Sequence, residues 1–195
     1  MKDKGAEERE SWLVLRAQSG DAEALNELLK AVQTPLFRYI SSLVGDAHLS
    51  ENILQEVFIR IYRKLHWLRE PAVFRSWAYQ IASRESFRQL KRERRWSTLG
   101  DETVLHTLTA PPPREEFAPD LIEQLPQLIK SLSPASRAVI VLYYLHEMSL
   151  VETAAILGIP LGTVKSRLAY GLESLRKHVR GRQRAKGMEQ SAAND

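Results

Sequence analysis

The spacing of apolar residues is the feature that most limits the folds open to this chain. Along most of its 195 residues, leucine, isoleucine, valine and aromatic residues recur every three or four positions, which is the period of one face of an α-helix. No run of alternating apolar and polar residues has the β-branched composition of a half-buried strand. The sequence therefore predicts an all-α protein.

Cap and turn residues divide the N-terminal part of the chain into three predicted helices. Asp21 is a suitable N-cap for the first, and Pro35 either interrupts that helix or restarts it. Ser50 is expected to cap a second, long amphipathic helix, because apolar residues follow it at helical spacing. Pro71 marks the start of a third helix, which is expected to end near Trp96. These helices predict an N-terminal helical domain.

The composition changes after the third helix. Residues 97–119 include Pro111, Pro112 and Pro113 in a row, scattered acidic residues and little apolar surface. Such a stretch is expected to be a flexible linker between two small helical domains. We therefore predict an N-terminal domain at 11–96, a linker at 97–119, a C-terminal helical domain at 120–180 and a polar tail that frays at 181–195.

The segment 149–180 carries the most specific pattern in the chain. Ser149 and Glu152 have the spacing of a capping box at the start of a short helix. Gly158 permits the tight turn that follows, and Pro160 suits the opening of a second, longer helix. A short helix, a turn with glycine and a longer helix form the layout of a helix-turn-helix, whose second helix enters the major groove of DNA.

The longer helix of this pair has two different faces. Its apolar face consists of Val164, Leu168, Leu172, Leu175 and Val179. The nearly opposite face carries Thr163, Ser166, Arg167 and Tyr170, with Lys165 on the flank. Arginine pairs bidentately with guanine, and hydroxyl side chains bond phosphates or base edges. The pattern favours DNA binding, although an antiparallel helix pair with one solvated face has the same pattern.

The positive charge is concentrated in two blocks. The formal net charge is +4, but residues 84–95 hold six Lys or Arg against two Glu, and residues 165–186 hold eight against one. Clustered cations favour a polyanion, because each phosphate contact releases condensed counterions. Aromatic residues beside the first block, such as Trp77, suit base stacking, but burial in a core is their commoner use. Solvated helix ends would account for the charge equally well.

Several function classes are disfavoured by what the chain lacks. It has no cysteine, so it forms no disulfide or thiolate metal site. Its five histidines are scattered, and it has no glycine-rich phosphate loop and no nucleophile with a paired base. We therefore expect no catalytic residue, no metal and no cofactor. A charged N-terminus and the lack of an apolar run of about 20 residues predict no membrane insertion and a cytoplasmic location.

Three motifs, in order, resemble the bacterial RNA polymerase sigma factors of the extracytoplasmic-function (ECF) group. SENILQEVFIRIY resembles their core-binding helix, FRSWAYQIASRESFRQLKRERR resembles their promoter-melting segment, and LSPASRAVIVLYYLHEMSLVETAAILGIPLGTVKSRLAYGLESLRKHV resembles their C-terminal promoter-binding domain. The resemblance covers about residues 19–179. It implies a subunit that joins core RNA polymerase and directs it to promoter DNA, and it implies an anti-sigma factor as a further partner.

The resemblance also implies roles for individual residues. Contact with core polymerase is implied for Asn52, Gln55, Glu56, Ile59 and Tyr62. Contact with the −10 promoter element is implied for Arg84, Arg88, Lys91, Arg92 and Arg95. Contact with the −35 element is implied for Thr163, Lys165, Ser166, Arg167 and Tyr170.

Two positions depart from the family pattern, and two other functions stay open. Asn52 stands where the family often has aspartate, and Arg84 stands at the usual asparagine, which bears on −10 readout. One alternative is a helix-turn-helix regulator that never joins polymerase. The other is a sigma-like interaction protein that has lost promoter activity. A sigma factor binds core polymerase and has little affinity for duplex DNA alone, whereas a regulator shows the opposite, so a pull-down separates them.

Overall fold

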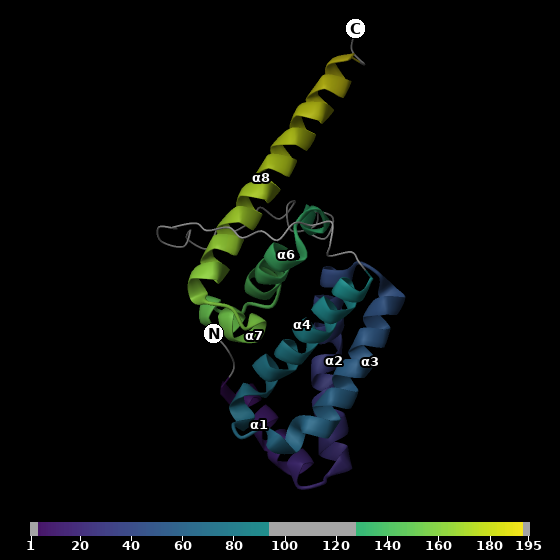
Figure 1. Cartoon of the computed structure of the whole chain (residues 1–195), viewed down its shortest axis with the longest axis vertical. Helices are drawn as coiled ribbons and strands as arrows, with labels where there is room; N and C mark the ends of the chain where they lie inside the picture. The colour runs from purple at the N-terminus through teal and green to yellow at the C-terminus, as the bar shows by residue number, and fades with distance from the viewer. Residues whose placement is uncertain (1–3, 94–127, 193–195) are drawn as a thin grey trace.

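The structure is a computed structural model that describes residues 4–93 and 128–192 and, beyond residue 178, only the backbone (Figure 1). Every regular element in these two ranges is a helix, which confirms the predicted all-α class. The N-terminal unit, residues 4–93, contains α1 (Lys4–Gln18), α2 (Ala22–Val44), α3 (Ala47–Lys64), η1 (Leu65–Trp67), η2 (Pro71–Val73) and α4 (Phe74–Arg92). The C-terminal unit, residues 128–192, contains η3 (Ile129–Ser131), α6 (Pro134–Ile140), the π-helical η4 (Val141–Leu145), α7 (Leu150–Leu157) and α8 (Leu161–Ala192).

Local capping chemistry sets the ends of α2 and α3. Asp21 caps α2 as predicted, and its carboxylate accepts hydrogen bonds from two backbone amides of the first turn. Gly45 ends α2 with φ 74°, in the left-handed region that favours glycine. Asp46 then caps α3 by accepting a hydrogen bond of 2.8 Å from the backbone amide of Leu49. The two helices are thus joined by a single tight turn.

The structure differs from the sequence expectations at three places in this unit. Helix α2 continues through Pro35 without interruption. Ser50 is not a cap: it is buried inside α3, and its hydroxyl donates to the backbone carbonyl of Asp46. Helix α1 begins at Lys4, before the expected domain start at residue 11. These helices pack around a shared core, in which the largest fully buried side chains are Leu28, Leu36, Tyr39, Ile40, Leu43, Ile61 and Phe74.

The C-terminal unit contains the predicted helix-turn-helix. Ser149 and Glu152 form the capping box of α7, with both reciprocal hydrogen bonds present. Gly158 ends α7 with φ 65°, and α8 begins three residues later at Leu161. The backbone of α8 is helical through Gly181 to Ala192, within the segment predicted to be a polar tail. The predicted linker, residues 97–119, lies outside the described residues.

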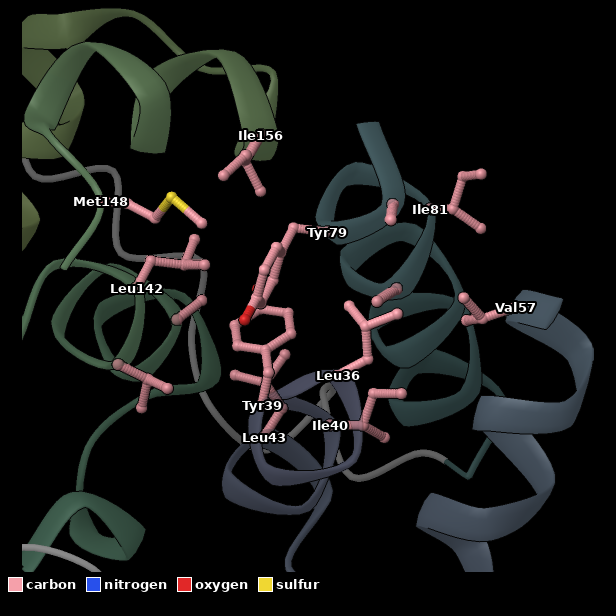
Figure 2. Close-up of a cluster of buried hydrophobic side chains, with 14 of the residues drawn as sticks. Leu36, Tyr39, Ile40, Leu43, Val57, Tyr79, Ile81, Leu142, Met148 and Ile156 are labelled. Atoms are coloured by element: carbon pink, nitrogen blue, oxygen red, sulfur yellow. The ribbon is translucent and has the colours of Figure 1, made fainter. Parts of the chain in front are cut away.

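The two units pack against each other. Helix α7 lies against α4, and α6 and η4 lie against α2 (Figure 1). Figure 2 shows Tyr39 and Tyr79 of the N-terminal unit pointing toward Leu142, Met148 and Ile156 of the C-terminal unit. All five side chains are at most 4% exposed, so the units share one continuous apolar cluster.

Candidate nucleic-acid interface

Helix α8 is held on its own unit by its apolar face, as predicted. Val164, Leu168, Leu172 and Leu175 are each at most 2% exposed, and the side chain of Val179 lies outside the described residues. Gly171 lets α8 approach α6 closely, because a Cβ atom at this position would lie 2.5 Å from Cδ1 of Ile140. Carbon atoms in favourable contact are about 3.5–4.0 Å apart. A side chain at residue 171 would therefore force the Ile140 side chain to shift.

The other side of α8 carries the residues predicted to contact the −35 element. Thr163, Lys165 and Arg167 are half-buried, and Tyr170 is 44% exposed. Ser166 is only 7% exposed, and its hydroxyl donates to the backbone carbonyls of Gly162 and Thr163 at 3.1 Å each. The expectation that Ser166 projects outward is wrong, because its hydroxyl folds back onto the carbonyls of its own helix.

Helix α4 carries the first basic block on its accessible side. Arg84, Lys91 and Arg92 are exposed, and the side chain of Arg88 is 60% exposed. Arg95, the fifth residue predicted to contact the −10 element, lies outside the described residues. Four of the five predicted cations are therefore accessible along one helix.

A buried carboxylate organises this basic surface. Glu85 is 6% exposed and forms ion pairs with Arg88 on α4 and with Arg60 on α3, where Nε and Oε1 are 2.7 Å apart. Charge-assisted pairs of this kind fix geometry as well as contributing energy. Charge counting along the sequence missed this arrangement, because Arg60 belongs to another helix. Helical spacing alone could have predicted that Glu85 is buried, because it lies one helical turn after Ile81 on the buried face of α4.

The residues predicted to contact polymerase lie together on the outer face of α3. Asn52, Gln55 and Glu56 are exposed, Ile59 is 43% exposed and Tyr62 is 68% exposed. The opposite face of the same helix is buried and consists of Ile53, Leu54, Val57 and Ile61. An exposed isoleucine and tyrosine beside three polar groups match the composition of a protein-binding surface.

His146 was assigned no role from the sequence, yet it connects the two units. Its Nδ1 lies 2.7 Å from the hydroxyl of Tyr79, and its ring packs edge-on against Tyr39 with centroids 5.8 Å apart. Burial, and to a smaller extent the charge of Arg38, lower the pKa of His146 from 6.5 to about 4. No sequence pattern predicts this contact, because both tyrosines and the arginine are more than 60 residues away along the chain.

Neither a metal site nor a membrane span is found in the part of the chain that the structure describes. Within residues 4–93 and 128–192, no three His, Asp or Glu side chains are grouped so that they could hold a metal ion. None of the helices described in these ranges is both long enough and apolar enough to cross a membrane.

Comparison with known proteins places the chain among relatives that share both of its units. The model of Sigma-70 region 2 matches residues 28–96, and the model of Sigma-70 region 4 matches residues 128–177. The chain is 30% identical over 177 residues to the ECF RNA polymerase sigma-E factor of Escherichia coli strain K12, a match that covers 86% of this chain and 92% of that protein.

Solved structures share the fold. A structure of CnrH in complex with the cytosolic domain of CnrY has a TM-score of 0.66 and 22% identity, and the match covers 89% of this chain and 98% of that one. The sigma factor RpoE of Bartonella quintana, in complex with the anti-sigma factor NepR, has a TM-score of 0.61 and 20% identity, with 80% of this chain and 96% of that chain covered. Together with the two Sigma-70 region matches, the sigma-E relative shows that the chain belongs to the ECF sigma factors, which direct RNA polymerase in transcription initiation.

Proposed function

We propose that this ECF sigma factor works through three surfaces, on α3, α4 and α8, that bind core RNA polymerase, the −10 element and the −35 element. It acts by binding, without catalysis or cofactor, in the cytoplasm where polymerase and promoter DNA meet. The observation that carries the proposal is shared by the three helices. Each buries one apolar face and leaves polar, aromatic or cationic side chains accessible on another.

The polymerase-binding surface is the outer face of α3. Ile59 and Tyr62 supply apolar area that is lost from water on docking, and Asn52, Gln55 and Glu56 supply polar contacts beside it. Tyrosine is one of the residues that most often contribute a large share of binding energy at protein interfaces. Tyr62, at 68% exposure, is therefore the residue whose truncation should weaken polymerase binding most.

The −10 surface is the basic side of α4. Arg84, Arg88 and Lys91 follow one another at intervals of four and three residues, and Arg92 is next to Lys91. The four cations lie along one side of the helix, which suits contact with a phosphate backbone. Arg84 stands where asparagine is usual in the family, and its charge favours a phosphate contact over base readout. The ion pair with Glu85 holds Arg88 in place for the same purpose.

The −35 surface is the N-terminal half of α8. Arg167 is the residue best suited to base readout, because a guanidinium bonds bidentately to guanine in the major groove. Thr163, Lys165 and Tyr170 lie on the same part of the helix and suit phosphate or base-edge contacts. Ser166 has a supporting role, since its hydroxyl bonds to the carbonyls of its own helix.

An anti-sigma factor is the expected regulatory partner. The Bartonella quintana relative in the solved complex is bound to the anti-sigma factor NepR, and that protein shares the fold of this chain. We propose that a protein of this class binds this chain and competes with core polymerase.

The proposal is tested by pull-down with core RNA polymerase and by run-off transcription on a library of promoter variants. Tyr62→Ala is expected to weaken polymerase binding at least tenfold, while Arg63→Ala, exposed on the same helix but outside the predicted set, leaves it nearly unchanged. Arg167→Ala is expected to cost roughly 1–3 kcal/mol at promoters with the preferred −35 sequence and little at the others.

Two outcomes would count against these assignments. A chain that binds duplex DNA by itself and does not associate with core polymerase is a regulator of another kind. An Arg167→Ala variant that weakens all promoters equally makes Arg167 a phosphate contact, and base readout then belongs to another residue of α8.

A further inference from the structure

Helix α8 continues well beyond the side chains that anchor it. Leu175, at 1% exposure, is the last of its described side chains to be buried, whereas the backbone stays helical as far as Ala192. The segment 176–192 is about 25 Å long at 1.5 Å per residue. Figure 1 shows the C-terminal end of α8, in yellow, projecting beyond the other helices. Its only large apolar residues are Val179 and Met188, so a buried apolar face does not account for this part of the helix.

The projecting segment is strongly cationic. Residues 176–192 hold six Lys or Arg against one Glu. Like charges four residues apart lie on the same side of a helix and destabilise it. The segment contains three such pairs of cations: Arg176 with Arg180, Arg180 with Arg184, and Arg182 with Lys186. A partner that supplies negative charge would therefore stabilise this part of α8.

Four of the cations share one side of the helix and form what we call the cationic stripe: Arg176, Lys177, Arg180 and Arg184. These positions fall within about 100° of one another around the helix axis, on the side away from the buried apolar residues of α8. Thr163 and Tyr170 of the −35 surface lie on the same outward side. Arg182 and Lys186 instead share the register of the buried residues.

The cationic stripe continues the −35 surface along the same helix. Arg180 and Arg184 follow Arg167, the residue proposed for base readout, by about 20 and 26 Å of helix. These lengths correspond to about six to eight base pairs at 3.4 Å each. The major groove winds around the duplex while a helix stays straight, so a helix that reads bases near its N-terminus meets phosphates further along. The recognition helix of a homeodomain contacts the backbone with its C-terminal end in this way.

We propose that the cationic stripe of α8 is a separate nucleic-acid contact, which binds phosphates of the duplex DNA flanking the −35 element. The proposal rests on the function proposed above, since α8 must first lie in the major groove at that element. Duplex DNA is favoured over an acidic protein surface because the stripe lies on the outward side of the helix that reads DNA. Phosphate contacts carry no sequence information, so the stripe adds affinity at every promoter and leaves the choice among −35 sequences to Arg167.

The test is promoter binding by holoenzyme, reconstituted from core polymerase and the full-length chain, at several salt concentrations and at a temperature too low for strand opening. Arg180→Gln with Arg184→Gln removes two cations from the stripe. The matched control, Arg182→Gln with Lys186→Gln, removes the same charge from the other side of the same segment. Glutamine has nearly the helix propensity of arginine and lysine, so both double variants keep the helix, which circular dichroism checks.

Each phosphate contact contributes about 0.9 to the slope of log affinity against log salt concentration, so the stripe variant should lower this slope by about 1.8. Its affinity should accordingly fall about 12-fold less than that of the natural chain between about 50 and 200 mM salt, at preferred and altered −35 sequences alike. The control variant should keep the natural slope.

Three results separate the proposal from its alternatives. Equal changes of slope in the two double variants would overturn it, because the cations would then act through net charge and not as one face. Affinity lost by the stripe variant without a change of slope would also overturn it and would assign the stripe to an acidic protein surface. A natural chain that does not join core polymerase, or whose holoenzyme does not bind promoter duplex, points to failure of the proposed function instead.

Discussion

Acidification is expected to open the contact between the two units, through protonation of His146. The charge of Arg38 comes from the N-terminal unit, and so does the part of the burial that is due to Tyr39 and Tyr79, whose rings pack against this histidine. In an open form these contributions are removed, so the pKa rises toward 6.5. A group whose pKa is depressed on closing stabilises the closed form above the open-form pKa. That stabilisation is lost as the pH falls from 6.5 toward 4.

The size of the effect follows from the two pKa values. With 6.5 in the open form and about 4 in the closed form, going from about pH 7.5 to about pH 5.5 raises the open-to-closed ratio about tenfold, or about 1.4 kcal/mol. His146 is only partly buried, and solvent screening reduces the shift, so about three- to tenfold is the expected range. The charged or titratable groups around the cavity beside His146 are Glu7 and Glu10 on α1, Arg38 on α2, Arg75 and Tyr79 on α4, and Glu147 and Glu152.

The assay is fluorescence energy transfer between the units. Lys64→Cys on α3 and Lys177→Cys on α8 place labels at exposed positions of different units in a chain with no natural cysteine. Transfer efficiency should fall as the pH is lowered from about 7.5 to about 5.5 and should recover on return. Circular dichroism over the same range separates opening from unfolding.

The matched control is His146→Gln, which keeps a hydrogen-bonding partner for Tyr79 but does not titrate. This variant should show a flat response, because the glutamine side chain does not titrate. An equal pH response in His146→Gln and in the natural chain would refute the reasoning. Constant transfer in the natural chain down to about pH 5 would do the same.

Two further predictions concern stability and are measured by urea unfolding. Gly171→Ala should destabilise the protein by about 1–3 kcal/mol, because its Cβ would lie 2.5 Å from Cδ1 of Ile140. The control Gly162→Ala meets no atom within 4 Å and should not destabilise it. Adding Ile140→Val to Gly171→Ala removes that Cδ1 and should recover part of the lost stability; no recovery would mean that the clash is not the cause. Ser149→Ala should cost about 1 kcal/mol by removing the N-cap of α7, and an unchanged midpoint would show that the capping box contributes nothing.

Local chemistry allowed much of the fold to be predicted from the sequence. Asp21, the Ser149 and Glu152 capping box and Gly158 are short-range signals, and each has the predicted role. Where two nearby residues compete, the same reasoning fails: Asp46 caps α3 and leaves Ser50 buried. Helix α1 was missed because its apolar residues are four consecutive positions from Trp12, without a helical period.

The arrangement of the site was harder to predict from the sequence. The faces of α3 and α8 follow from helical spacing alone, so the accessible sides of both helices were largely predictable. Contacts between distant segments do not follow from spacing, and Glu85 with Arg60 is one example. His146 with Tyr79 is another, since it depends on how two units pack after each has folded. The predicted outward orientation of Ser166 is wrong for a third reason: its hydroxyl bonds to the backbone of its own helix.

The hydrogen bonds of the buried Arg137 are divided unequally between the two units. Three of its four hydrogen bonds go to backbone carbonyls of its own unit, at Ile129, Lys130 and Leu132, and only the bond to Leu43 crosses to the other. If the two units separate, Arg137 therefore keeps three of its four hydrogen bonds, and these continue to stabilise the C-terminal unit. Since the acceptor on α2 is a main-chain oxygen, the identity of the side chain at that position does not matter to the bond. The Leu43 side chain is itself fully buried, so its conservation would reflect the packing of the core and not this hydrogen bond.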